Sequence, residues 1–502
     1  LNEVHRMETF DMDATNGFLD SKWYHLYCSV QRCNSALRVL NAATDEQVNG
    51  RVSRIAEMKV LRAHYYFELS RLFNKIPYFD ENVEISQYPD IPNNEFTRDE
   101  ILSMLAKEML DAAEQLPASQ PEVGRIHKYI ALAYAAKIKL YQAYQQDEIT
   151  HAVTSINKEL LREVVSLCDQ VTASNRYGLL DDFQGLDLVT NENGKESVFA
   201  IQYSMNDGTE SAGRINWSNL LNSPGGGSPY GGDGFFLPSQ DLINAYQTDA
   251  NGLPDFNYQS KSDYSWAVLN NGVYTLQNTT PNVDPRLDFV VGRPTITWKT
   301  YPDKPCEGWV RDKDTYGYNC AKRFWVSPES SDMFNGWPWG ASQLNWQIIR
   351  YADILLWKAE ALIELNEGNG LETARDLINQ IRNRARNSAY VKDFNDHSKY
   401  AANYLVNPYP ADVWNQDYAR QALRWETRLE KALEGERFFD LVRWGIVETT
   451  MNKYITAESD NRIYYANAHF TGGKDEYYPV PNNQYGFSGG KYVQNPGYAP
   501  FN

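Results

Sequence analysis

The sequence contains 502 residues and carries a formal net charge of −17, from 48 Lys and Arg against 65 Asp and Glu. This balance excludes nucleic acid as a partner, because binding to phosphates needs a concentrated basic face and no run of five or more like charges occurs. Hydrophobic residues make up 42% of the chain, which is enough for large cores, but no run of 18 apolar residues predicts a helix that spans a membrane.

The N-terminal part of the sequence has helical periodicity. From Arg51 to Phe73, apolar residues recur at steps of three and four and form one stripe of an amphipathic helix. Thr97 and Glu100 form a capping box at the start of the next helix, which Pro117 ends. A third helix is expected from about Arg125. The pattern predicts helix pairs joined by short turns.

The same pattern returns near the C-terminus. Residues Gln347 to Leu365 are predicted to form one helix, and a second follows the turn at 367–370, with Ala374 and Ile381 on its apolar face. Repeated antiparallel pairs of this size are typical of tetratricopeptide units. Because the strict repeat consensus is absent, an ordinary helical bundle is the alternative.

Between these ends, from Asn216 to Trp346, Gly and Pro are dense and helical periodicity persists only around Pro238 to Tyr246. Eight of the 13 tryptophans fall in this stretch: Trp217, Trp266, Trp298, Trp309, Trp325, Trp337, Trp339 and Trp346. The sequence therefore predicts an N-terminal helical scaffold at 1–215, a loop-rich, Trp-rich insertion at 216–346, and a C-terminal helical scaffold with closing loops at 347–502.

Metal-binding patterns are weak. Residues 11–13 and 312–314 begin like calcium loops, but their twelfth positions are Lys22 and Arg323 instead of an acid, so neither is an EF-hand. No zinc, nucleotide-phosphate or dinucleotide motif occurs. We expect no cofactor, with an irregular structural calcium site left open.

Two of the five cysteines, Cys306 and Cys320, lie in the loop-rich stretch. They would be able to form a disulfide in an oxidising compartment, and two free thiols are the alternative.

Glu426 is the one acid that we weigh as a catalyst. It lies on the apolar face of a helix predicted over 417–433, and a buried Glu with a raised pKa can act as a general acid in a glycoside hydrolase. The favoured alternative is a buried ion pair, because an unpaired buried charge is costly. The nearby candidate partners are Arg424, Arg428, Arg437 and Arg443.

Aromatic residues make up 13% of the chain. Trp and Tyr on Gly- and Pro-rich loops suit carbohydrate binding, because the C–H face of a pyranose packs on the electron-rich face of an aromatic ring. For any single Trp the alternative is packing in the interior, since large rings are mostly buried.

An ordered series of sequence landmarks runs along the chain. Its members are Trp23–Tyr27, Arg32–Asn34, Leu61–Leu69, Ile76–Pro77, Arg350–Leu356, Ile378–Ala385, Arg428–Trp444, Tyr478–Pro481 and Gln494–Tyr498. Taken together, these landmarks resemble those of the SusD/RagB family, the surface nutrient-binding lipoproteins of Bacteroidota, over essentially all 502 residues.

The resemblance implies a mainly α fold, in which four tetratricopeptide-like helix pairs carry a large irregular insertion. It implies a non-enzymatic protein that binds oligosaccharide or polysaccharide and delivers it to a SusC-like TonB-dependent transporter, with a peptide-binding member of the same family as the alternative. It also implies an outer-membrane, cell-surface location through an N-terminal lipid anchor. This chain opens at Leu1 without the signal peptide or lipidated cysteine.

Family binding sites combine a ring shortly before the first helix with rings from the central loops. The resemblance places the first ring at Phe10, with Asp13 as a polar contributor. The candidates from the central loops are Tyr230, Trp266, Trp309, Trp337 and Trp339. By contrast, Trp357, Trp425 and Trp444 lie in helices or scaffold motifs and are assigned to packing.

Overall fold

The computed structural model describes residues 2–209, 213–217, 222, 225, 228–299, 301–327, 330–334, 336 and 340–501. It is 45% helix and 10% strand, which confirms the mainly α prediction. The chain forms two compact units, which we call unit 1 (residues 1–175, 438–453 and 467–502) and unit 2 (residues 176–437 and 454–466). The predicted insertion at 216–346 belongs to unit 2 together with the helices that follow it.

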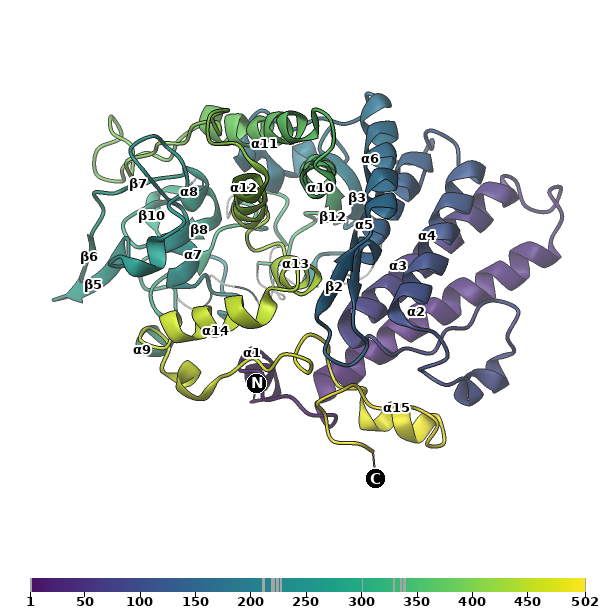
Figure 1. The fold of residues 1–502 in the computed structure, drawn as a ribbon. Helices are drawn as coiled ribbons and strands as arrows, with labels where there is room; N and C mark the ends of the chain where they lie inside the picture. The colour runs from purple at the N-terminus through teal and green to yellow at the C-terminus, as the bar shows by residue number, and fades with distance from the viewer. Residues whose placement is uncertain are drawn as a thin grey trace. The chain divides into compact units, whose positions relative to one another are not determined.

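Unit 1 is built on a row of helices. These are α1 (Asn2–Glu8), α2 (Gly17–Ala42), α3 (Arg51–Phe73), α4 (Arg98–Gln115), α5 (Lys128–Ala143) and α6 (Lys158–Ala173). From α2 to α6, each helix packs against the next in the sequence, as the purple-to-blue helices of Figure 1 show. This succession of helix pairs is the tetratricopeptide-like scaffold.

Local sequence signals explain several of these boundaries. Helix α3 spans the predicted residues, and α4 begins with the predicted capping box, in which the Thr97 hydroxyl accepts from the Glu100 backbone N–H. Helix α5 begins at Lys128, three residues later than expected, and most of its side chains are buried because α4 and α6 pack on it. Because α5 lies in the core, apolar residues occupy most sides of this helix instead of a single face.

After α5 the chain forms strand β1 (Tyr144–Gln146), which pairs antiparallel with β2 (Val153–Ile156). Three further helices lie near the C-terminus: α13 (Arg437–Arg443), α14 (Val447–Glu458) and α15 (Asn482–Phe487). The C-terminal segment of unit 1 is held by Asn495, whose amide donates to the backbone carbonyls of Phe73 and Tyr478, both at 2.7 Å.

Unit 2 also has a helical part. It contains α10 (Tyr351–Leu365), α11 (Gly370–Asn387) and α12 (Gln416–Glu430), and each packs against the other two. The prediction that α10 starts at Gln347 was wrong, because residues 346–350 form strand β12 (Trp346–Arg350), which pairs with β3 (Ser197–Ile201). The apolar stripe predicted for α11 is buried.

The loop-rich part of unit 2 contains short elements that pair only locally. The helices are α7 (Gln240–Ala245), α8 (Arg286–Val290) and α9 (Lys313–Tyr316), with the 3-10 turn η6 (Ile463–Asn467). The strands are β4 (Gln247–Thr248), β5 (Trp266–Asn270), β6 (Val273–Gln277), β7 (Asn282–Val283), β8 (Val291–Gly292), β9 (Thr297–Trp298), β10 (Tyr301–Pro305) and β11 (Cys320–Ala321). Every sheet among the described residues is a two-stranded antiparallel pair.

The short elements of unit 2 are joined by a hydrophobic core that includes Tyr246, Leu287, Val290 and, from α12, Leu429. Within the described ranges, no helix is long and apolar enough to cross a membrane.

Candidate functional site

Two of the predicted ligand-binding rings, Tyr230 and Trp309, lie inside unit 2. They are only 1% and 3% exposed, and they pack with Trp298 and Trp325 in one buried cluster. The Trp298 indole donates to the Tyr230 hydroxyl at 2.9 Å, and that hydroxyl donates to the Val326 carbonyl at 2.8 Å. In this structure both rings pack the interior and neither offers a face to a ligand.

Cys306 and Cys320 belong to the same buried cluster, and both are free thiols in this structure. The cluster is packed closely around Gly292. A Cβ at that position would lie 2.6 Å from the Trp298 ring and 2.7 Å from the Cys320 sulfur, so only glycine fits.

Trp266 differs from these rings because it is 44% exposed. It begins the β5–β6 hairpin, where it pairs with Gln277, while Leu269 pairs with Tyr274. Because successive side chains of a strand point to opposite faces, Trp266 lies on one face of the hairpin and Tyr274 on the other.

Four tyrosines outside the predicted set form two partly exposed ring pairs, which we together call the tyrosine surface: Tyr274 with Tyr318, and Tyr316 with Tyr464. Tyr274 meets Tyr318 edge to face with ring centroids 5.7 Å apart, and Tyr316 lies 5.7 Å from Tyr464. Burial and the nearby Tyr318 raise the pKa of Tyr274, so its hydroxyl is protonated at neutral pH. The rings come from the hairpin, the α9 segment and η6.

Polar side chains lie in the same loops. Arg311 donates to the Gly232 carbonyl at 2.5 Å and lies 3.6 Å from the Asp233 carboxylate, while Glu307 is exposed. Asp312, from the second calcium-like segment, accepts from the Thr315 backbone N–H and caps α9. In the part of the chain that the structure describes, no three His, Cys, Asp or Glu side chains gather into a group that would hold a metal ion. The structural calcium stays a prediction.

The two N-terminal candidates lie in unit 1. Phe10 is half-buried, with its ring 5.0 Å from that of Phe470. Asp13 accepts hydrogen bonds from Thr15 and, at 2.7 Å, from Arg6, which hold its pKa down at about 2. Trp337 and Trp339 lie outside the described residues, so their predicted role stays a prediction.

Glu426 is fully buried and its carboxylate lies 2.6 Å from Arg286 and 3.0 Å from Arg382, both also fully buried. The prediction of a buried ion pair is confirmed, but the suggested partners were wrong, because the two arginines come from α8 and α11 instead of from α12 and its neighbours. Arg428, for example, pairs with Asp241. In this structure Glu426 has no access to a substrate.

Glu426 belongs to a larger buried charge network. On the next turn of α12, Glu430 bonds Arg350 at 2.7 Å, and it also contacts Arg384 and Arg286. Burial alone would raise the pKa of Glu430, but these three guanidinium groups overcome it and hold the value at about 2. Glu426 and Glu430 therefore serve the fold.

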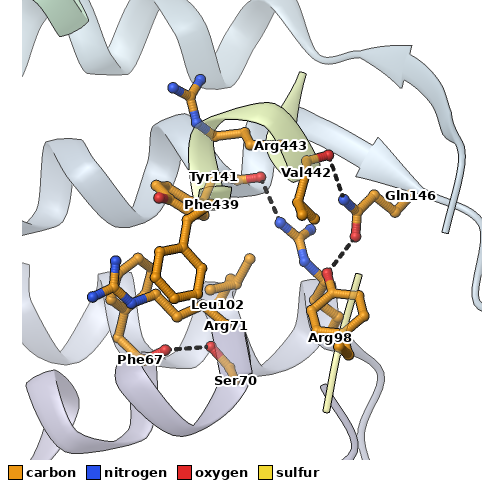
Figure 2. Close-up of a pocket in the computed structure, with 11 residues that line it drawn as sticks. Phe67, Ser70, Arg71, Arg98, Leu102, Tyr141, Gln146, Phe439, Val442 and Arg443 are labelled. Atoms are coloured by element: carbon orange, nitrogen blue, oxygen red, sulfur yellow. Dashed lines mark hydrogen bonds between the residues drawn. The ribbon is translucent and has the colours of Figure 1, made fainter. Parts of the chain in front are cut away.

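A small cavity inside unit 1 is also a packing feature. Figure 2 shows Gln146 donating to the Val442 carbonyl and Arg98 donating to the Tyr141 carbonyl. The Gln146 side-chain carbonyl accepts from the Tyr477 hydroxyl. The cavity volume is about 10 Å³, which leaves room for no more than about one water molecule.

The packing assignment of the three scaffold tryptophans is confirmed. Trp357 and Trp444 are buried, and Trp425 packs against the core of unit 2. The tyrosine surface was not predicted, because tryptophan is concentrated in the loop-rich stretch whereas tyrosine is spread along the chain. Its signal in the sequence was the Tyr-Gly-Tyr at 316–318.

Comparisons with known proteins identify a family. The sequence profile of the SusD family matches residues 195–498, and a second profile, described as starch-binding associating with outer membrane, matches residues 3–140. SusD-like protein P2 of Formosa agariphila is 24% identical over 498 residues, covering 98% of this chain and 83% of the relative.

Solved structures show the same fold. A SusD superfamily protein from Bacteroides vulgatus matches with a TM-score of 0.72 at 21% identity, over 99% of this chain and 89% of that one. Surface glycan-binding protein A from Bacteroides uniformis matches with a TM-score of 0.65 at 20% identity, over 98% and 88%.

Proposed function

Because the chain belongs to the SusD family, we propose that it binds oligosaccharide or polysaccharide at the bacterial cell surface and delivers it to a SusC-like TonB-dependent transporter. The observation that carries this proposal is the tyrosine surface of unit 2, together with Trp266, which is exposed on the other face of the hairpin that carries Tyr274. The name of the Bacteroides uniformis neighbour, a surface glycan-binding protein, and the starch-binding description of the second matching profile support it.

The chemistry of this surface suits an uncharged sugar. Aromatic faces carry a negative quadrupole and a large apolar area, and both favour packing against pyranose C–H groups. Tyrosine hydroxyls both donate and accept hydrogen bonds, and Arg311 and Glu307 offer a donor and an acceptor in the same loops. A glycan therefore finds both stacking area and hydroxyl partners.

The proposal is non-enzymatic. Glu426, the one acid weighed as a catalyst, is held between Arg286 and Arg382 with no exposed surface. The proposal includes no cofactor. The proposal includes an outer-membrane location through an N-terminal lipid anchor. The description of the second profile, associating with outer membrane, supports the location.

Affinity electrophoresis and calorimetry against starch, laminarin, xylan and mannan test the proposal. We expect one of these glycans to bind, and Tyr316→Ala combined with Tyr318→Ala to weaken that binding by about tenfold or more. Tyr400→Ala is the matched control, because Tyr400 is a 54% exposed tyrosine outside the tyrosine surface. Equal affinity of both variants would exclude the surface, and binding of peptides alone would move the protein to the peptide-binding branch of the family.

A further inference from the structure

A larger cavity lies in unit 1, between the segment before α2 and the C-terminal segment. Its volume is about 360 Å³, and its lining includes Asp13, Thr15, Asn482, Tyr485, Tyr498 and Phe501. Small-molecule sites in proteins typically have volumes of about 300–1,000 Å³. The cavity therefore has room for a ligand, unlike the small cavity of Figure 2.

The walls of this cavity are fixed to the scaffold. The Asn482 backbone N–H donates to the Ala14 carbonyl at 2.9 Å, which ties the two walls together. The side chains of Asn483 and Gln484 donate to the Asp20 carboxylate at 2.8 and 2.7 Å and hold α15 against the first turn of α2. A ligand would meet a largely preformed site, which lowers the entropy cost of binding.

One side of the cavity is aromatic. Tyr485 and Phe501 stack with centroids 4.1 Å apart and ring planes within 12°. Tyr498 is held in place, because its hydroxyl donates to the Tyr477 carbonyl at 3.0 Å. This arrangement of flat rings is the kind that packs against a pyranose.

The other side of the cavity is polar. Asp13, whose low pKa keeps it ionised at neutral pH, accepts three hydrogen bonds from Thr15 and Arg6. A carboxylate has about four acceptor positions, and the Asp13 side chain is 46% exposed, so one acceptor position is open to a ligand. Within the described part of the chain, the Asn482 amide and the Tyr485 hydroxyl have no hydrogen-bond partner.

The charge of the cavity favours a neutral ligand. Arg6 lies 2.7 Å from the Asp13 carboxylate and balances its charge, so neither a cation nor an anion gains much there. We propose that this cavity is a second carbohydrate subsite, which takes one uncharged pyranose unit of a glycan between Tyr485 and Asp13. The inference rests on the proposed function and adds a site in unit 1 to the tyrosine surface of unit 2.

The test uses the full chain and calorimetry with maltoheptaose, laminarihexaose, xylohexaose and mannohexaose as probes. We expect the Tyr316→Ala, Tyr318→Ala variant to keep residual binding of the probe that the unmodified chain binds. Adding Tyr485→Ala or Phe501→Ala should weaken this residual binding by about tenfold, and Tyr485→Phe, which keeps the ring, should weaken it less. Phe487→Ala is the matched control, because Phe487 lies on the same helix and is 58% exposed outside the cavity.

Each outcome decides the proposal. Residual binding that Tyr485→Ala, Phe501→Ala and Tyr485→Phe all leave unchanged overturns the subsite. If the Tyr316→Ala, Tyr318→Ala variant binds no probe, the subsite is overturned as well, whereas the proposed function is not. If the unmodified chain binds none of the four probes, both the subsite and the proposed function are overturned. Thermal unfolding of every variant shows whether a loss of binding comes from misfolding.

Discussion

Unit 2 carries two sets of aromatic side chains in the same stretch of sequence, and they have opposite environments. Tyr230 and Trp309 pack with other rings in a buried cluster, whereas Trp266 and Tyr316 are exposed. Tyr230 is fixed by the hydrogen bond from its hydroxyl to the Val326 carbonyl, and the exposed rings stand on a hairpin and a short helix. Residue type and loop composition therefore do not decide which ring is free to meet a ligand.

Replacing the buried Trp309 should have the largest effect. Trp309→Ala leaves a cavity in the cluster and should lower the free energy of unfolding by about 4 kcal/mol. Trp266→Ala, its exposed counterpart, should change it by less than about 0.5 kcal/mol. Urea unfolding of both variants measures the difference, and similar losses would show that the two sets of rings are not distinct.

The same contrast applies to acids on helix α12. Glu426→Gln removes a charge from between two buried arginines and should cost about 3 kcal/mol of unfolding free energy. Asp417→Asn, at a 94% exposed side chain on the same helix, should be close to neutral. If glycan cleavage were detected in the unmodified protein and abolished in a folded Glu426→Gln variant, the structural role assigned to Glu426 would be wrong.

The smallest expected effect is a dependence on pH. The pKa of Glu430 is about 2 in the folded state, below the value of about 4.3 in an unfolded chain. Its contribution to stability is therefore fully present above about pH 4.3 and is lost as the pH falls toward 2, by about 2 kcal/mol between pH 5 and pH 3. Glu430→Gln should show a shallower loss over this range, while Asp417→Asn should follow the unmodified protein.

Local signals predicted much of the scaffold. The stripe of α3 and the capping box of α4 depend on residues three and four positions apart, so the sequence was sufficient to place them. The start of α10 was misplaced because residues 346–350 pair with β3, about 150 positions earlier. Pairing over that distance leaves no mark in the local periodicity.

The candidate site was less predictable. The family followed from the sequence, whereas the exposure of Trp266 did not. The tyrosine surface was not predictable either, because it depends on Tyr464 lying beside Tyr316, nearly 150 positions apart. The partners of Glu426 were missed for the same reason, since Arg286 and Arg382 reach it from two other helices.

By itself, the sequence determined the mainly α scaffold and the family, because these depend on local periodicity and ordered landmarks. Only the tertiary structure decided which rings are buried, which arginines neutralise Glu426 and Glu430, and which C-terminal rings meet Asp13 across a cavity. Burial and ion pairing depend on contacts between distant segments, and a loop sequence carries no periodic signal of such contacts.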